Sequence, residues 1–123
     1  PNQISVKLLA LQIHNMKTLK FRKALSKLIL EGKKTATWRL FDDKNLSTGD
    51  IVSFIVWETL EEFLQVKIIS TKETTFEKLT EEDWYGHEKF KSNEEMYKTY
   101  SNYYNSKVTK DSPVKIIKFK LIN

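Results

Sequence analysis

Hydrophobic side chains recur along the chain at two spacings, and the first of them is typical of a helix. Phe21, Ala24, Leu25, Leu28 and Ile29 follow the spacing of one helix face. Gly32 comes directly afterwards, where a glycine commonly ends a helix in the left-handed conformation. The pattern therefore predicts a helix that ends at Gly32.

The second spacing is the alternation of a strand. Residues 35–40 (TATWRL) predict a short strand, residues 47–50 (STGD) a turn, and residues 50–58 and 63–70 two further strands. In the last of these, Leu64, Val66 and Ile68 are opposed by Gln65 and Lys67. Near the C-terminus, Ile117, Phe119 and Leu121 are opposed by Lys118 and Lys120, which predicts a half-solvated sheet.

Helical signals interrupt these strands. Thr80 with Asp83 predicts the cap of a short helix, and Ser92 with Glu95 forms a capping box before a longer one. In the longer segment, the side chains of Tyr97, Tyr100 and Tyr104 share a face. Strands that are interrupted by helices predict an α+β domain, built round a small curved antiparallel sheet or barrel.

Length and composition set the frame for this fold. The 123 residues suit a single domain (1–123) with one core. No apolar run approaches the length of about 20 residues that spans a bilayer, and the N-terminal segment lacks the features of a secretory signal. The absence of cysteine excludes disulfides and thiolate chemistry. We therefore expect a soluble, cytoplasmic protein without a cofactor or a membrane partner; the sequence carries no signal for its oligomeric state.

The net charge of +5 is unevenly distributed. Between Met16 and Arg39 eight basic residues face a single acidic one, Glu31, whereas acidic residues cluster at residues 81–83. A positive patch raises the local concentration of ligands that carry phosphate. Lysines also solubilise ordinary helix faces, so charge by itself does not separate the two interpretations.

The segment EGKKTATWR, residues 31–39, joins the predicted helix to the first predicted strand. Lys33 and Lys34 could simply complement the helix dipole, and Thr35 could be present because β-branched residues suit a strand. Together, however, Gly32, Lys34, Thr37 and Arg39 form the pattern G-x-K-x-x-T-x-R after an amphipathic helix. The residues by themselves leave two interpretations of this segment open, a solvated connector and the floor of a binding site.

Nearly the whole chain resembles the ASCH domain family. The resemblance rests on this pattern, on the Gly49-Asp50 turn, on the segment LTEEDWYGHEKF (79–90), on the tyrosine-rich helix and on the closing strand. That family is similar in fold to the PUA domain, a pseudobarrel of about five or six strands with helices closing its ends. The resemblance implies a cleft beside the motif that faces RNA, another nucleic acid or a nucleoside. On this resemblance we interpret residues 31–39 as the floor of the site. The substrate-binding residues that we expect are Gly32, Lys33, Arg39, Trp84 and Tyr85.

One small bacterial branch of the family hydrolyses N4-acetylcytidine to cytidine and acetate with a lysine, a threonine and a glutamate. The resemblance to this branch implies catalytic roles for Lys34 and Thr37, and for Glu88 if one residue is inserted before it. Glu82 and Asp83 are the alternative carboxylates.

The implied chemistry is physically sensible. A threonine hydroxyl becomes nucleophilic when a base takes its proton, and a desolvated lysine can be neutral enough to act as that base. Lys34 and Thr37 are three residues apart, so on a strand they would face opposite sides, and the turn after Gly32 must bring them together. A carboxylate near Lys34 would favour the charged ammonium, so desolvation would have to prevail. Arg39 could hold a carbonyl or a phosphate through its planar fork.

Aromatic residues and histidines add three expectations. Trp84 and Tyr85 lie in a polar segment near Glu88 and are candidates for stacking on a base, whereas Trp57 on an apolar strand is expected to serve in core or rim packing. His14 and His87 are too few and too far apart in the sequence for a metal site, so no metal is expected.

Three functional hypotheses follow. The domain is a binding module for RNA or a modified nucleoside, an amidohydrolase acting on N4-acetylcytidine, or a protein-interaction module of a transcription- or translation-related complex. The first predicts salt-dependent RNA binding, and the second predicts turnover that depends on Lys34 but not on Lys20 or Lys27.

Overall fold

A five-stranded mixed sheet dominates the computed structural model, which describes residues 16–122 of the chain. The elements in chain order are β1 (Lys17–Phe21), α2 (Lys23–Leu30), β2 (Ala36–Arg39), β3 (Ile51–Val56), β4 (Glu62–Thr75), a 3-10 helix (Phe76–Lys78), α3 (Glu81–Trp84), α4 (Asn93–Tyr104) and β5 (Pro113–Leu121). The expected α+β class is confirmed.

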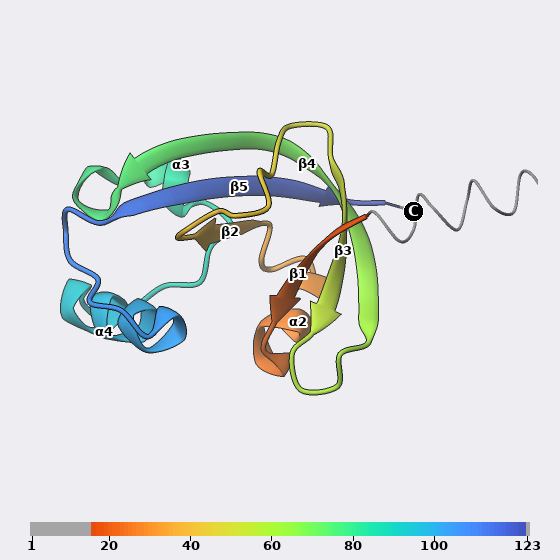
Figure 1. Cartoon of the computed structure of the whole chain (residues 1–123), viewed down its shortest axis with the longest axis horizontal. Helices are drawn as coiled ribbons and strands as arrows, with labels where there is room; N and C mark the ends of the chain where they lie inside the picture. Colours follow the sequence, from red (N-terminus) through yellow and green to blue (C-terminus); the bar gives the residue numbers. More distant parts are fainter. Residues whose placement is uncertain (1–15, 123) are drawn as a thin grey trace, which may run out of the picture.

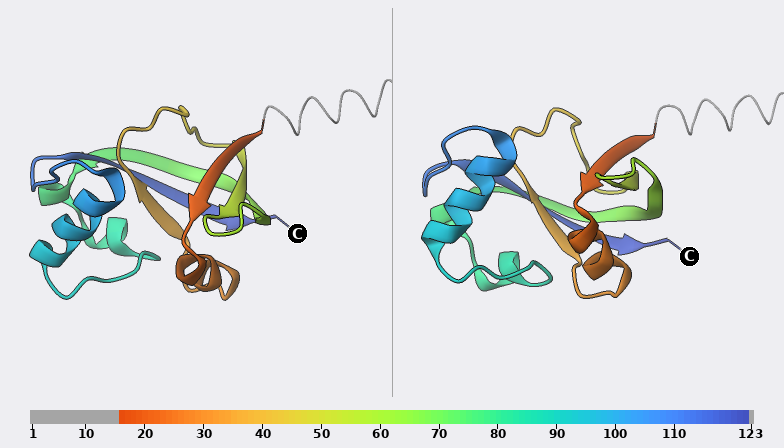
Figure 2. Two further views of the ribbon diagram at one scale, coloured as in Figure 1. Left: turned by 60° about the horizontal axis from the view of Figure 1, so that its bottom comes forward. Right: turned by 90° about the horizontal axis from the view of Figure 1, so that it is seen from below.

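The strand order in the sheet is β1-β3-β4-β5-β2. Strands β1 and β3 are parallel, and all other neighbours are antiparallel. The long strands β4 and β5 run side by side, and helices α4 and α2 lie beneath opposite ends of the sheet, as Figures 1 and 2 show. The sheet curves into a half-barrel whose edges, β1 and β2, are not paired with each other. We call the space between these two edges the seam.

A bulge contributes to the curvature of the sheet. The register of β4 against β5 shifts between Ile68, which faces Phe119, and Ser70, which faces Lys118. Ile69 is thus an extra residue, and an extra residue bends the strand and increases its twist. The expected strand over residues 63–70 is confirmed, but β4 continues to Thr75.

Two hydrophobic clusters form the core, and β5 contributes to both. Ile117 and Phe119 belong to the first cluster, with side chains of β1, α2, β3 and β4. Val114 and Ile116 belong to the second, which includes residues of β2 and α4. Successive residues of a strand point to opposite faces, so the neighbours Ile116 and Ile117 reach different clusters.

The half-solvated pattern expected for the last strand is therefore only partly right. Ile117 and Phe119 are buried as expected, but Leu121 is 41% exposed because it lies at the end of β5. On the opposite face, side chains of α4 pack over the beginning of the strand. Local alternation could not reveal this second layer.

The region from residue 17 to Gly32 differs from the sequence-based expectation in one respect. Phe21 was expected on the helix, but it ends β1 and is buried in the first cluster, together with Leu19 two positions earlier. The helix α2 begins only at Lys23. Its end is as expected, because Gly32 has a φ of +76°.

The caps predicted for the other two helices are present. Thr80 and Asp83 form a reciprocal capping box at α3, and the Ser92 side chain accepts a hydrogen bond from the Glu95 backbone N–H at α4. Tyr97, Tyr100 and Tyr104 all pack in or against the second cluster, which confirms their common face. No helix within residues 16–122 is long and apolar enough to span a membrane.

Candidate functional site

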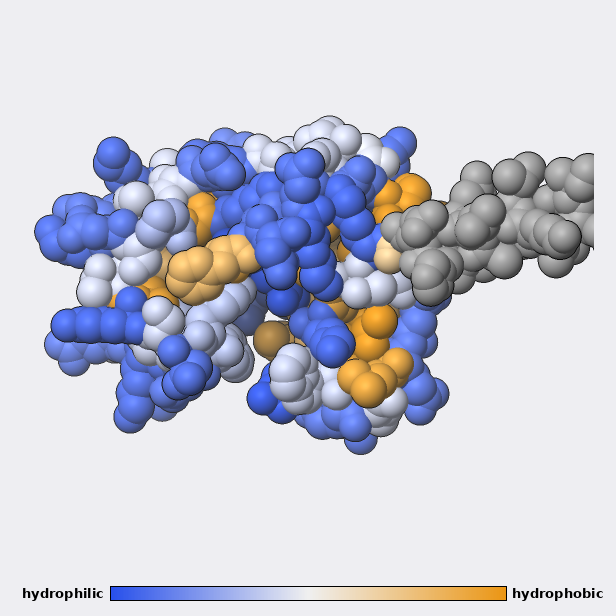
Figure 3. All heavy atoms as spheres, viewed as in Figure 1, coloured by the Kyte–Doolittle hydropathy of each residue, from blue (hydrophilic) through white to orange (hydrophobic). Residues whose placement is uncertain are grey.

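A cavity of about 470 Å³ opens at the seam, between the two hydrophobic clusters. Figure 3 shows the surface hollowed between the side of the molecule that carries α4 and the side that carries α2. Both edge strands contribute to the walls, as do α2, α4 and the segment after α3. The lining residues are Lys20, Phe21, Arg22, Leu25, Lys34, Thr37, Trp38, Arg39, Trp57, His87, Glu88, Tyr100, Asn102, Tyr103 and Tyr104.

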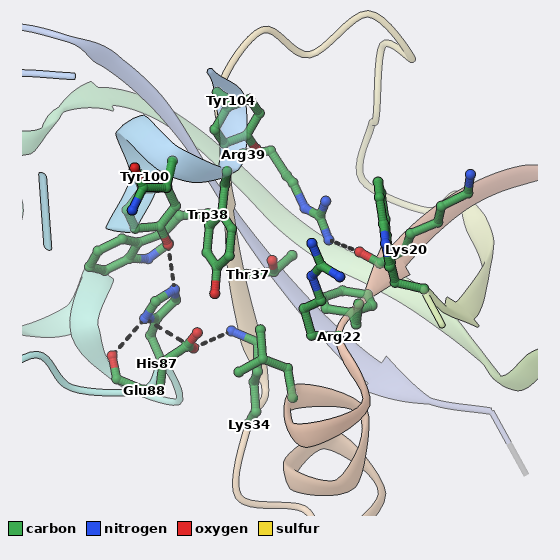
Figure 4. A pocket seen from close by; sticks show the side chains of 15 residues that line it. Lys20, Arg22, Lys34, Thr37, Trp38, Arg39, His87, Glu88, Tyr100 and Tyr104 are labelled. Carbon is green, nitrogen blue, oxygen red and sulfur yellow. Dashed lines mark hydrogen bonds and ion pairs between the residues drawn. The ribbon is translucent and has the colours of Figure 1, made fainter. Parts of the chain in front are cut away.

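Arg39 bridges the seam. Its guanidinium Nη2 donates a hydrogen bond to the backbone carbonyl of Lys20, at 3.0 Å, and its Cζ lies 4.7 Å from the centre of the Phe21 ring. The bond joins β2 to β1 where no backbone ladder does (Figure 4). The Nε of Arg39 is buried and has no hydrogen-bond partner within residues 16–122.

The turn after α2 places Lys34 at the bottom of the cavity. The backbone N–H groups of Lys33 and Lys34 both donate to the carbonyl of Leu28, which folds the chain back under the helix end. The Lys34 side chain is only 2% exposed. Its Nζ donates to the Ala36 carbonyl at 2.7 Å and to Oε1 of Glu88 at 2.5 Å.

Gly86 brings the segment that carries Glu88 against this turn. Its carbonyl accepts hydrogen bonds from the N–H groups of Thr35 and Ala36, at 2.8 and 3.1 Å. A Cβ at Gly86 would lie 2.0 Å from Oγ1 of Thr35, and the φ of Gly86 is +81°. Only glycine tolerates both the contact and the conformation, so this residue allows Lys34 and Glu88 to meet.

The Lys34–Glu88 pair has opposed electrostatic influences. Burial lowers the pKa of Lys34 from its ordinary value, and this outweighs the charge of Glu88, which acts in the opposite direction. For Glu88, burial raises the pKa, but the attraction of Lys34 and His87 prevails and the pKa lies below its ordinary value. Glu88 is therefore a carboxylate, and the proton on Lys34 is held less firmly than that on a solvated lysine.

His87 supports this pair from behind. Its Nε2 lies 3.1 Å from the Tyr100 hydroxyl, and its Nδ1 lies 2.8 Å from the backbone carbonyl of Glu88 and 3.3 Å from the Glu88 carboxylate (Figure 4). The ring stacks on Trp38 with centroids 3.8 Å apart. Burial, reinforced by the charge of Lys34, lowers the pKa of His87 to about 3, so the ring is neutral at physiological pH.

These contacts select one tautomer of His87. A carbonyl can only accept a hydrogen bond, so Nδ1 carries the proton and Nε2 accepts from the Tyr100 hydroxyl. The resulting series of contacts runs from Tyr100 on α4 through His87 and Glu88 to Lys34. Helix α4 thereby controls the position of the carboxylate.

Thr37 completes the group of three side chains to which catalysis was assigned on the basis of the resemblance. It lies on β2, is 4% exposed, and lines the same cavity as Lys34 and Glu88. Within residues 16–122 its hydroxyl has no hydrogen-bond partner inside the protein. The turn between Gly32 and β2 places Lys34 and Thr37 on one cavity although they are three residues apart.

Other residues expected at the site do not line this cavity. Gly32 and Lys33 are exposed on the outer side of the turn. Trp84 packs against Trp38, with centroids 4.5 Å apart, and Tyr85 is 76% exposed. Trp84 instead borders a second, shallower cavity at the start of α3.

The alternative carboxylates are not part of the cavity either. Asp83 pairs with Lys72 at 3.0 Å and caps α3 through Thr80, and Glu82 is exposed on the same helix. Glu88 is thus the one acidic residue among those that line the cavity.

Trp57, which was expected to serve in core or rim packing, does not lie in the core. The side chain is 50% exposed, belongs to neither hydrophobic cluster and lines the cavity. Trp57 directly follows β3, where the sheet ends, so no layer covers it. The apolar pattern of the strand gave no indication of where the covering layer stops.

Sequence reasoning also missed His87, Tyr100 and Tyr103. The pattern HE at residues 87–88, next to the expected carboxylate, was the available signal for His87. Tyr100 was recognised as part of a helix face with Tyr97 and Tyr104, whereas Tyr103 was not singled out. Nothing local showed that this helix borders a cavity. Among the described residues no three acidic or histidine side chains gather as a metal site would require, and His14 lies outside these residues.

The half-barrel with an open, basic cavity at its seam defines an α+β protein of the PUA-like type. The sequence pattern of the ASCH domain matches residues 12–123, and the chain belongs to this family, which is broadly related to RNA binding. The resemblance inferred from the motif is therefore confirmed.

Solved structures agree with this assignment. The ASCH domain from Lactobacillus crispatus JV V101 superposes with a TM-score of 0.63 at 16% identity, over 85% of this chain and 79% of that one. A protein from Enterococcus faecalis V583 gives 0.73 at 12% identity, over 96% and 91% of the two chains. A hypothetical protein gives 0.66 at 27% identity, over 87% and 99%. None of the curated proteins matches the chain significantly.

Proposed function

We propose that the seam cavity binds a nucleoside, either free or as one residue of an RNA. The observation that carries this proposal is the convergence of Lys34, Thr37, Arg39 and Glu88 on one cavity. Its volume of about 470 Å³ falls in the range of about 300–1,000 Å³ that is usual for small-molecule sites. The relation of the family to RNA binding favours a nucleoside over other small molecules.

The polar groups of the cavity suit the edge of a nucleobase. A carboxylate at Glu88 accepts hydrogen bonds from an exocyclic amine, while Lys34 and the guanidinium of Arg39 donate to ring nitrogens or carbonyl oxygens. Phe21, Trp38 and Tyr100 provide aromatic walls.

Calorimetric titration with the four common ribonucleosides and N4-acetylcytidine tests this proposal. We expect at least one of them to bind, and Lys34→Ala and Arg39→Met each to weaken its binding about tenfold or more, as befits loss of a hydrogen bond from a charged donor. Lys120→Gln is the matched control, because this exposed lysine on β5 does not line the cavity. Equal affinities in all variants would contradict the proposal.

A second candidate function, hydrolysis of the N4-acetyl group of acetylcytidine, is favoured by two buried reactive groups. Lys34 is 2% exposed with a lowered pKa, and Thr37 is 4% exposed with a hydroxyl that is unpartnered within residues 16–122. A lysine in this state can accept the proton of a threonine hydroxyl. Both groups line the same cavity as the carboxylate of Glu88.

The chemistry would proceed in two steps. The Thr37 hydroxyl oxygen attacks the acetyl carbonyl while neutral Lys34 takes its proton, and the amide C–N bond breaks as that proton passes to N4 of cytosine. A water molecule then hydrolyses the threonine ester, releases acetate and restores the hydroxyl. Glu88 holds Lys34 in position through their contact at 2.5 Å and, as a carboxylate, can accept a proton in the second step.

Release of cytidine from N4-acetylcytidine, followed by chromatography, tests the second candidate. The hypothesis predicts that turnover disappears in Lys34→Ala and Thr37→Ala and persists in part in Thr37→Ser. Lys27→Gln is the control and should leave turnover unchanged, since the exposed Lys27 lies outside the cavity. If N4-acetylcytidine binds but is not hydrolysed, the binding function is retained and the enzymatic one is ruled out. Nothing among the described residues favours the third hypothesis, a protein-interaction module, over these two.

A further inference from the structure

Trp57 presents an unusual surface at the mouth of the cavity. Its side chain is 50% exposed, belongs to neither hydrophobic cluster, and lines the cavity. The backbone holds it firmly, because the Trp57 N–H donates to the Phe21 carbonyl at 2.8 Å. The neighbouring Glu58 carboxylate accepts a hydrogen bond from the Lys23 N–H at the start of α2. The backbone at Trp57 is thus anchored, and its large aromatic side chain is left half in water.

Two cations accompany this ring. The guanidinium carbon of Arg22 lies 4.8 Å from the centre of the Trp57 ring, and Nζ of Lys20 lies 5.4 Å from it. Both side chains also line the cavity and are exposed. Neither forms an ion pair with any acidic residue in the part of the chain that the structure describes. We call Lys20, Arg22 and Trp57 the rim.

The charge of the whole cavity is positive. Lys20, Arg22, Lys34 and Arg39 carry positive charge, and Glu88 is the one acidic lining residue, already paired with Lys34. A neutral nucleoside carries no charge that could pair with the two rim cations. A phosphodiester group next to the bound nucleoside is negatively charged and can pair with both. The rim therefore points to a ligand that continues beyond the cavity as a charged strand.

We propose that the rim is a second subsite, which takes the neighbouring nucleotide of a single-stranded RNA whose first nucleotide occupies the cavity. The Trp57 ring stacks on the neighbouring base, and Arg22 and Lys20 contact the phosphate that joins the two nucleotides. This inference rests on the proposed nucleoside-binding function and specifies its ligand as a strand rather than a free nucleoside.

The exchange of contacts is favourable. An exposed cation–π contact is weaker than the stacking of a base on an aromatic side chain, so a base can displace a cation from one face of Trp57. The displaced cation then lies beside the phosphate of that same nucleotide. Tyr103, which is 52% exposed on α4, also lines the cavity and offers a further face for the strand. Helix α4 lies across the hollow from α2 (Figures 1 and 3).

Three ligands separate the subsite from the cavity. They are the tightest-binding common ribonucleoside, a five-nucleotide RNA with that nucleoside at its centre and uridine on both sides, and the same RNA with abasic flanking positions. Binding of each to the full chain is measured by calorimetry with wild type, Trp57→Ala and Arg22→Gln. Lys23→Gln is the control, because Lys23 is an exposed neighbouring cation that does not line the cavity.

For wild type we expect the pentanucleotide to bind at least tenfold more tightly than the nucleoside. Trp57→Ala should weaken the pentanucleotide about tenfold, which is typical of one lost base stack, and leave the nucleoside and the abasic strand unchanged. Arg22→Gln should weaken both strands, spare the nucleoside and reduce the salt slope by about 0.7, the value for one phosphate contact on a single strand. Lys23→Gln should behave as wild type.

Two results would overturn the proposal while leaving nucleoside binding intact. One is a pentanucleotide that binds no more tightly than the nucleoside, and the other is a Trp57→Ala variant that binds the pentanucleotide as wild type does. If Trp57→Ala weakens the free nucleoside as much as the strand, the ring belongs to the cavity and the rim is not a separate subsite. If no nucleoside or strand binds at all, both the rim and the proposed function fail.

Discussion

The Nζ of Lys34 and the Oε1 of Glu88 lie 2.5 Å apart, although 54 residues separate them in the chain. The lysine is buried, and the carboxylate is 22% exposed toward the cavity. A buried charge without its partner is strongly destabilising, so each residue depends on the other. This interdependence means that stability and ligand binding respond differently when the pair is changed.

Lys34→Met should lower the free energy of unfolding by about 2–4 kcal/mol, because it leaves the Glu88 carboxylate unpaired. Adding Glu88→Gln to this variant removes the remaining charge and should recover at least half of the loss. Chemical denaturation of the single and double variants measures both values. Nucleoside binding should stay lost in the double variant, since both Lys34 and the Glu88 carboxylate are absent from it. A double variant that is no more stable than Lys34→Met would contradict the interdependence of the two residues.

Acid should destabilise the protein in part through His87. The folded-state pKa of this residue is about 3, well below its ordinary value of 6.5, so the unfolded chain binds a proton more readily throughout that interval. The stability that neutral His87 contributes is thus complete above about pH 6.5 and is lost as pH falls toward about 3, with a slope approaching 1.4 kcal/mol per pH unit.

Comparison with His87→Gln isolates this contribution. Denaturation of both proteins between about pH 6.5 and pH 5 avoids most of the interval in which carboxylates titrate. We expect the free energy of unfolding to fall with decreasing pH in wild type and to stay nearly level in the variant. Parallel pH profiles for the two proteins would show that folding does not lower the pKa of His87.

Tyr100→Phe should lower the free energy of unfolding by about 1–3 kcal/mol, because it leaves the buried Nε2 of His87 without its donor. The matched control is Tyr97→Phe on the same helix, whose hydroxyl has no hydrogen bond within residues 16–122. Nitrogen NMR shifts of the imidazole report the tautomer directly. A wild-type ring protonated on Nε2 would contradict the assignment.

Gly86→Ala should destabilise the fold and abolish ligand binding. The new methyl group meets Oγ1 of Thr35 at 2.0 Å, and the backbone conformation with φ +81° adds strain of about 1–3 kcal/mol. Gly49→Ala is the control for strain alone, because Gly49 has a φ of +93° but open space around its Cβ position.

The clash and the strain can be separated further. Thr35→Ala removes the nearest atom, Oγ1, so the double variant Thr35→Ala/Gly86→Ala should regain part of the stability that Gly86→Ala loses. Thermal unfolding of the three variants measures this. If Gly86→Ala loses no more stability than Gly49→Ala, the close contact between Gly86 and Thr35 does not contribute to the loss.

Much of the secondary structure was predictable because its causes are local. The end of α2 at Gly32, the caps at Thr80 and Ser92, and the tyrosine face of α4 all depend on residues within about one or two helical turns. The motif around Lys34 and Thr37 was recognisable for the same reason, since its residues lie within one short segment.

Features that depend on distant partners were not predictable in this way. Strand β1 is paired in parallel with β3, 35 residues further along, and its last residue, Phe21, was expected on the helix. Trp57 follows an apolar strand and was expected in core or rim packing, and the sheet ends there and leaves the ring exposed at the cavity. Burial is decided by which layer covers a face, and the strand itself does not encode that layer.

The sequence by itself determined the family, the curved α+β sheet and the group of residues from Gly32 to Arg39, because these follow from local periodicity, caps and a short motif. Only the tertiary structure decided that Glu88, and not Glu82 or Asp83, faces Lys34. It likewise decided that Arg39 bridges the seam to the Lys20 carbonyl. The physical reason is that both contacts join unpaired strand edges and loops that are brought together by the closing of the sheet, which no local pattern specifies.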